Sequence, residues 1–316
     1  MTQNLDNMAS IALGYLASGK GAALATVIST WGSAPRPKGA QLAIAEDGGF
    51  QGSVSGGCVE GAVILAAQDA IQDGKCRVLE YGVADEDAFA VGLACGGDIQ
   101  ILVEPIGVGH GPDKQLLKAA IDAIKTRQPF AYRVNLNTWA RNRVDPAGLT
   151  TGKQDDVFTY VANPNLQMII IGAVHVTQTL APLARMAGYD VSLIDPRDSF
   201  ATKARFPNEC FINAWPDEAL TQIGLDAHTA VITLSHDPKI DTPALAVAIK
   251  SDVFYIGALG SKKTHAKRVT ELQSQGCTDN EIARIHGPIG LDIGSKNPAE
   301  IAISIMAEVT ERLRRP

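Results

Sequence analysis

Apolar residues follow two different periods along the chain, and these periods separate the predicted helices from the predicted strands. In the first half, apolar positions three and four residues apart predict a helix at residues 5–16. A Ser/Gly-rich turn then leads into a second helix, which ends at Gly74. Short apolar or β-branched runs predict strands at 22–29, 41–45, 50–54, 77–81 and 98–104, followed by a helix at 112–127 and an edge strand at 130–136.

The second half of the chain alternates strands with helices. Strands are predicted at 166–171, 190–194, 230–234 and 253–256, and helices at 174–187, 243–250, 264–275 and 298–313. This alternation is typical of a parallel, doubly wound sheet. Residues 137–165 are polar and contain Gly and Pro, and we place a domain boundary there. The predicted fold class is α/β, with an N-terminal α/β domain at 1–163 and a C-terminal Rossmann-like domain at 164–316.

Composition and charge narrow the classes of function. Hydrophobic residues make up 46% of the 316 residues and charged residues 20%, which suits a packed core and argues against a disordered chain. The net charge of −6 argues against nonspecific binding to nucleic acid. Five cysteines without close pairing indicate reduced thiols, and residues 1–19 lack the Lys or Arg of an export signal. We therefore expect a cytoplasmic protein with no nucleic-acid or membrane partner.

The most distinctive candidate site is the run Ser55-Gly56-Gly57-Cys58-Val59-Glu60. It places a thiol after two glycines at the start of a helix, where backbone amides and the helix dipole attract an anion and favour a thiolate. Such a thiolate can act as a nucleophile, a soft-metal ligand or a sulfur carrier. Two plainer readings remain open: Cys58 can be a small buried hydrophobic residue, and Glu60 can simply complement the positive end of the helix.

Two further motifs carry related chemistry in the first half. Cys95-Gly96-Gly97 again sets a thiol beside two glycines, without the C-x-x-C pairing of a structural zinc site. The loop at 32–39 holds Ser33, Arg36 and Lys38 together with two prolines, and a stiffened loop with these groups suits an anion or a phosphate. A solvated loop with two incidental cations is the alternative.

The second half carries an altered dinucleotide-binding pattern. Gly172 follows a predicted strand, but Val174 and Thr177 stand where the second and third glycines of that pattern belong. Asp195 stands where a ribose-binding acid is expected. We favour a Rossmann scaffold kept for packing or for another ligand over one that binds NAD(P). Gly260 and Ser261 follow the last predicted strand and suit a phosphate at a helix start.

Taken together, these motifs resemble the XdhC/CoxI family, the accessory factors of molybdenum hydroxylases such as xanthine dehydrogenase. The resemblance covers nearly the whole chain and rests on GSAPRPKGA (32–40), SGGCVE (55–60), ACGGDIQ (94–100), DPR (195–197), SHD (235–237), GSK (260–262), PIGLDIG (288–294) and PAEIA (298–302). The chain departs from the GAGHVG-like turn of the family at Val174 and Thr177, and it has Lys262 where arginine is commoner.

The resemblance implies a chaperone rather than an enzyme. It would bind molybdenum cofactor in its molybdopterin form, support the sulfuration of that cofactor with a cysteine desulfurase, and deliver it to the large subunit of a molybdenum hydroxylase. The resemblance also implies a homodimer, with Cys58 and Cys95 as molybdenum contacts. The implied cofactor-binding residues are Ser33, Arg36, Lys38, Ser55, Gly56, Gly57, Cys58, Glu60, Cys95, Gly96, Gly97, Gly172, His175, Asp195, Arg197, Gly260 and Ser261.

Two alternative functions remain open at this point. The second-half fold and Asp195 would also suit an NAD(P)-dependent oxidoreductase. A docking scaffold that only bridges desulfurase and hydroxylase would need neither cysteine.

Overall fold

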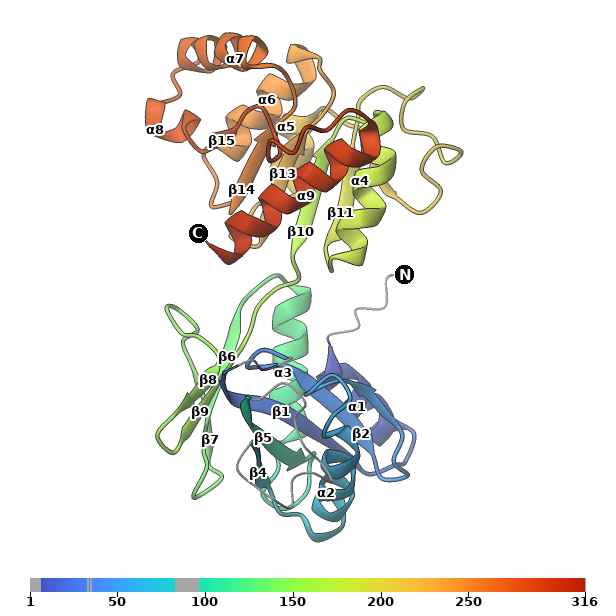
Figure 1. Ribbon diagram of the computed structural model, residues 1–316, viewed down its shortest axis with the longest axis vertical. Helices are drawn as coiled ribbons and strands as arrows, with labels where there is room; N and C mark the ends of the chain where they lie inside the picture. The colour runs from blue at the N-terminus through green and yellow to red at the C-terminus, as the bar shows by residue number, and fades with distance from the viewer. Residues whose placement is uncertain (1–6, 33, 35, 83–96, 316) are drawn as a thin grey trace. The chain divides into compact units, whose positions relative to one another are not determined.

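A computed structural model describes residues 7–32, 34, 36–82 and 97–315 (Figure 1). The chain divides into two units, Met1–Pro164 and Asn165–Pro316, which are called unit 1 and unit 2 below. In the described part of the chain, no helix is both long enough and apolar enough to span a lipid bilayer.

Unit 1 contains an antiparallel five-stranded sheet in the order β3-β2-β1-β5-β4. Its strands are β1 (Ala22–Trp31), β2 (Gln41–Ala45), β3 (Phe50–Gly52), β4 (Arg77–Tyr81) and β5 (Asp98–Pro105). Side chains alternate between the two faces of β1. Ala23, Ala25 and Val27 pack against α2 (Glu60–Asp73), whereas Leu24 packs with α1 (Met8–Ala17) and α3 (Lys114–Lys125) on the opposite face.

A second antiparallel sheet of unit 1 lies largely where the sequence analysis expected no regular structure. It contains β6 (Phe130–Asn135), β7 (Arg141–Val144), β8 (Gly152–Gln154) and β9 (Val157–Ala162) in the order β7-β6-β9-β8. The prediction of β6 as an edge strand is wrong, because β7 and β9 flank it. The strands β7 and β8 were missed because they are short and polar, and they lie at the edges where one side needs no apolar partner.

Unit 2 is built on a parallel six-stranded sheet in the order β12-β11-β10-β13-β14-β15. The strands are β10 (Gln167–Ile171), β11 (Asp190–Ile194), β12 (Cys210–Ile212), β13 (Thr229–Thr233), β14 (Tyr255–Ala258) and β15 (Ile285–His286). This arrangement confirms the predicted doubly wound fold. The strand order reverses direction between β10 and β13, and open α/β sheets bind ligands at the carboxyl ends of the strands flanking such a point.

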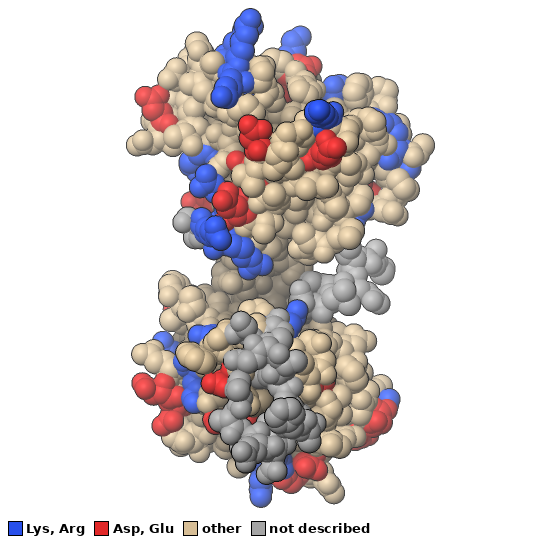
Figure 2. Space-filling view, in the orientation of Figure 1, with Lys and Arg blue, Asp and Glu red and all other residues tan. Residues whose placement is uncertain are grey.

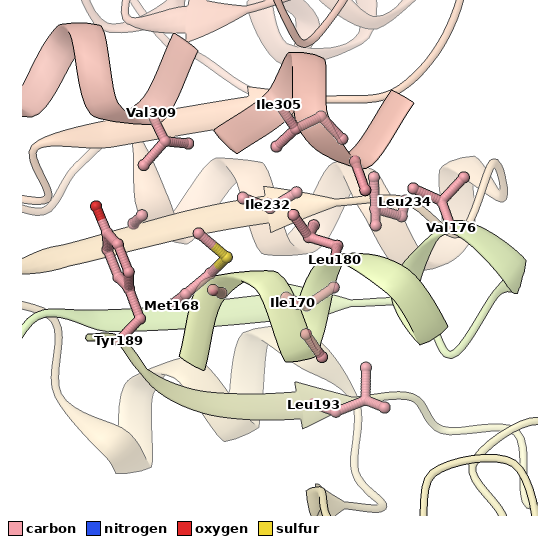
Figure 3. Close-up of a cluster of buried hydrophobic side chains, with 14 of the residues drawn as sticks. Met168, Ile170, Val176, Leu180, Tyr189, Leu193, Ile232, Leu234, Ile305 and Val309 are labelled. Carbon is pink, nitrogen blue, oxygen red and sulfur yellow. The ribbon is translucent and has the colours of Figure 1, made fainter. Parts of the chain in front are cut away.

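Helices cover both faces of this sheet, which explains the continuous apolar runs of its strands. Ile170 and Ile232 point towards α4 (His175–Met186) and α9 (Pro298–Arg314), as Figure 3 shows. Ile169 and Val231 point to the other face, towards α5 (Pro216–Ile223) and α6 (Pro238–Ala248). The helices α7 (Lys262–Ser274) and α8 (Asp279–Ile282) add Leu272 and Ile282 to that second cluster; these two residues and their neighbours close the core on that side.

Several elements of unit 2 differ from the prediction. The helix α6 begins at Pro238 rather than at residue 243, because the side chain of Asp237 caps it and a proline is tolerated in the first turn. The short elements β12, α5, α8 and β15 were not predicted, since each spans too few residues to show a clear period.

Candidate functional site

The loop between β3 and α2 is organised by one buried carboxylate. Glu60 is the first residue of α2, and only 8% of it is exposed. Its Oε1 accepts hydrogen bonds from Ser53 Oγ at 2.7 Å, from Ser55 N at 2.9 Å and from Val54 N at 3.2 Å. Its Oε2 accepts from Gly57 N at 2.9 Å and from the Ser55 hydroxyl. Five donors of the loop therefore converge on a single side chain.

The electrostatic state of Glu60 follows from these contacts. Burial raises the pKa of this carboxyl group, but the hydrogen bonds from Ser55 and Ser53 outweigh it and lower the pKa to about 2. Glu60 is therefore ionised at neutral pH. The loop amides of Val54, Ser55 and Gly57, which the sequence analysis assigned to a cofactor anion, donate to this internal carboxylate instead.

This loop holds the thiol of Cys58 at a half-buried position just before α2. Gly56 and Gly57 adopt φ angles of 77° and 118°, a region that favours glycine. No heavy atom lies within 4 Å of the place where a Cβ on Gly57 would stand, so the chain is open to space beside the thiol. On its other side, Cys58 packs against the core cluster that contains Ile99 and Val59. A thiol anchored on one side and open on the other can meet a ligand without rearrangement of the loop.

Two other predicted motifs lie at the same end of the five-stranded sheet. Arg36 Nε donates to Ser53 O at 3.3 Å, which ties the 32–39 loop to the loop of Cys58. Gly97 is buried and precedes Asp98, whose strand partner is Trp31 at the start of the 32–39 loop. The structure therefore brings together the described parts of all three motifs. Ser33, Cys95 and Gly96 lie outside the described residues.

Basic side chains accompany these motifs. Lys38 is exposed, and its aliphatic part lies against Gly152 of β8. Lys153, the next residue in β8, donates from Nζ to Gln100 Oε1 at 3.1 Å. Lys153 was missed by the sequence analysis, because it stands in a polar segment about 50 residues beyond the nearest motif and only the sheet pairing brings it close. Gln100 could have been found, since it belongs to the ACGGDIQ run.

The remaining described cysteines lie in different surroundings. Cys76 is buried beside Arg141 and Glu104, and burial raises the pKa of its thiol to about 11. Cys277 is buried, whereas Cys210 is exposed at the start of β12. Within the described ranges, no three or more His, Cys, Asp or Glu side chains are grouped so that they could hold a metal ion.

In unit 2, the carboxyl ends of β10 and β13 approach each other closely. Gly172 has a φ of 107°, and a Cβ at this position would stand 2.7 Å from Ser235 N. The hydroxyl of Thr177, which occupies the third place of the dinucleotide pattern, is buried and donates to Gly172 O at 2.6 Å. Val174 stands just before α4, and His175, its first residue, is exposed.

Asp195 closes this turn from the inside. It is completely buried; its Oδ2 accepts from Ala173 N at 2.7 Å and from Arg197 Nη2 at 2.8 Å. Its Oδ1 accepts from Arg197 N and Nε at 3.0 and 2.9 Å. Burial raises the pKa of Asp195, yet the bonds from Arg197 and Ala173 lower it below its usual value. Both oxygens are fully engaged, so neither is left for the ribose hydroxyl that the sequence analysis assigned to it.

Gly260 and Ser261 form the connection from β14 to α7. Ser261 caps α7, because its hydroxyl accepts from Thr264 N at 3.1 Å. β14 is the neighbour of β13, so this connection lies beside the Ser235–Asp237 segment at the carboxyl edge of the sheet. Unit 2 thus gathers its own predicted residues at one edge, separately from those of unit 1.

Comparison with known proteins identifies the family of this chain. Residues 15–82 match the XdhC and CoxI family, and residues 168–309 match the XdhC Rossmann domain. A relative from Escherichia coli (strain K12), named molybdenum cofactor insertion chaperone PaoD, is 31% identical over 98% of this chain and 89% of its own length. A relative from Bacillus subtilis (strain 168), whose name makes it a probable component of xanthine dehydrogenase, is 26% identical over 93% of this chain and 94% of its own.

A solved structure supports the same assignment. The crystal structure described as a xanthine dehydrogenase from Bacillus halodurans matches with a TM-score of 0.78 and 25% identity, over 98% of this chain and 96% of that one. The likeness therefore covers both units as well as the motifs of the candidate site. The chain belongs to the XdhC/CoxI family.

Proposed function

We propose that this chain is a maturation factor that binds molybdenum cofactor, supports its sulfuration and delivers it to a molybdenum hydroxylase of the xanthine dehydrogenase kind. The proposal is supported by the chaperone name of a relative that aligns over 98% of this chain. The observation that carries it is the Cys58 thiol, half-buried on a loop that Glu60 holds in shape. The cofactor is cargo here, so the chain acts as a carrier and turns over no free metabolite.

The side chains around Cys58 suit the chemistry of this cargo. A thiolate is a soft ligand of the kind that binds transition metals. Arg36, Lys38 and Lys153 supply positive charge at the same end of the sheet and suit the phosphate of the pterin. Because the loop donors are already satisfied by Glu60, the loop keeps its shape before the cargo arrives. Cys95 is proposed as the second thiol of the site.

The partners belong to the same proposal. A cysteine desulfurase would supply the sulfur, and the large subunit of the hydroxylase would receive the cofactor. We propose that the chain works in the cytoplasm as a homodimer. An NAD(P)-dependent oxidoreductase is the less favoured function, because Asp195 is engaged by Ala173 and Arg197.

The first experiment measures the cargo. The protein is purified without oxygen from a host that makes molybdenum cofactor, and molybdenum and pterin are quantified by mass spectrometry and by fluorescence after oxidation. We expect near-stoichiometric amounts of both in the wild type and a loss of at least tenfold in Cys58→Ala. Cys210→Ala is the matched control, because Cys210 is also accessible but lies in unit 2.

Two results would contradict the proposal. Equal cargo in Cys58→Ala and wild type would remove Cys58 from the site, and absence of cargo from every variant would refute the carrier role. Loaded wild-type protein should also activate a cofactor-free hydroxylase, and protein loaded in a host without cysteine desulfurase should not. Activation that is independent of the desulfurase would refute the role in sulfuration.

A further inference from the structure

The start of α7 in unit 2 carries an unusual concentration of positive charge. The first turn of this helix contains Lys262 and Lys263 and no acidic residue. Both lysines are exposed, and Figure 2 shows basic side chains projecting from the surface over α7. A helix N-terminus is itself positive, so two ammonium groups there repel it and each other. An anion bound at this end would remove that repulsion.

The backbone at this helix start also has donors to offer. An α-helix leaves its first four amides without acceptors in the helix. The Ser261 hydroxyl accepts from Thr264 N, which leaves the amides of Lys262 and Lys263 available. Gly260 has a φ of 144°, which turns the chain sharply between β14 and the helix. The turn therefore sets two amides beside two ammonium groups.

A buried guanidinium beneath this turn supplies an independent observation. Arg268 is only 6% exposed, and its Nη2 donates to Leu259 O at 3.1 Å, so the side chain reaches back along α7 to the residue before Gly260. Its Nη1 is buried and has no hydrogen-bond partner in the described part of the chain. Buried donors are nearly always satisfied in proteins, so this N–H indicates an acceptor that the chain does not provide.

The acid nearest to Arg268 does not fill that role. Asp241 Oδ2 lies 3.8 Å from Arg268 Nη2, too far for a hydrogen bond, and within the described residues this oxygen also has no hydrogen-bond partner. The other oxygen of Asp241 accepts from the Ser235 hydroxyl at 2.6 Å. Burial lowers the pKa of Arg268 more than Asp241 and Glu271 raise it, which shows that these acids leave the cation partly uncompensated.

We propose that the start of α7 is a binding site for the phosphate group of a small molecule. The amides and ammonium groups of Lys262 and Lys263 would contact the phosphate oxygens, and the guanidinium of Arg268 would support them from below. The site lies at the carboxyl edge of the parallel sheet, where open α/β folds bind ligands. It is built from unit 2 alone and does not depend on the function proposed for Cys58.

The test uses the full chain with inorganic phosphate and pyrophosphate as probes, followed by isothermal titration calorimetry at constant ionic strength. We expect saturable binding to the wild type that weakens at least tenfold in the double variant Lys262→Ala/Lys263→Ala. The matched control is Lys118→Ala/Lys125→Ala on α3, which removes the same charge elsewhere and should change affinity less than twofold. Arg268→Lys keeps the charge but loses the planar fork, and should weaken binding about fivefold.

Two outcomes would overturn the proposal: no saturable binding of either probe, or equal weakening in both double variants. Titration with nucleoside monophosphates then distinguishes the sources of the phosphate. A nucleotide that binds more than tenfold tighter than pyrophosphate supports the site as one for nucleotides, whereas equal binding supports a bare phosphate group. Cys58→Ala should leave all these affinities unchanged, which separates this site from the cargo site of unit 1.

Discussion

Five donors of the loop at 53–57 share the carboxylate of Glu60, and their arrangement depends on its negative charge. In Glu60→Gln the charge is lost, and an amide NH₂ group faces donors that need acceptors. We expect a loss of about 1–3 kcal/mol in the free energy of unfolding, measured with urea at pH 7. The thiol of Cys58 should also react faster with a thiol reagent. Glu311→Gln, at an exposed position, should change neither quantity.

The same substitution predicts a dependence on pH. The pKa of Glu60 is about 2 in the folded chain, below its ordinary value of 4.5. The ionised group therefore contributes stability that is complete above about pH 5 and is lost as the pH falls from 4.5 towards 2. The difference in unfolding free energy between wild type and Glu60→Gln should shrink over this range. A difference that stays constant between about pH 6 and pH 3.5 would refute this account of the loop.

Single residues also show where prediction from sequence reached its limit. Cys58 and Arg36 were predicted from their own motifs, and the structure places them on two loops that touch. Lys153 carried no local signal, because only the packing of β8 brings it to Gln100. Asp195 was predicted at the correct place in the fold, yet its partners could not be read from its position.

Among the elements, the turn from β10 to α4 depends on a glycine for two separate reasons. Gly172 has a positive φ, and a Cβ there would collide with the backbone of Ser235. Gly188, in the turn after α4, has a φ of 88° but open space around it. We expect Gly188→Ala to cost about 1 kcal/mol of stability from backbone strain alone. Gly172→Ala should cost at least about 2 kcal/mol more, because the collision adds to the strain.

Differential scanning calorimetry of the two variants and the wild type measures both costs. The comparison isolates the close approach of β10 and β13, since the strain in φ is shared by both glycines. Equal losses in the two variants would mean that the sheet edge relaxes around an added Cβ.

For the whole molecule, the distribution of the core predicts two separate unfolding transitions. Each hydrophobic cluster among the described residues lies entirely within unit 1 or entirely within unit 2. Calorimetry should therefore resolve two transitions, with Glu60→Gln lowering the midpoint of one and Gly172→Ala lowering the midpoint of the other. A single transition that both variants shift equally would show that the two units unfold together.

The sequence by itself determined the α/β class, the parallel sheet of unit 2 and most of the longer helices and strands. These features depend on the period of apolar residues along a short stretch, which is a local property of the chain. It also identified the motifs that lead to the XdhC/CoxI family, because their residues are contiguous.

Only the tertiary structure decided which polar groups meet. It placed the loop amides around Glu60 rather than around an open anion site, and it closed Asp195 onto Ala173 and Arg197. It also left Arg268 buried with an unsatisfied donor at the start of α7. A buried polar group takes its partners from whichever elements pack beside it, and that packing depends on contacts far apart in the sequence.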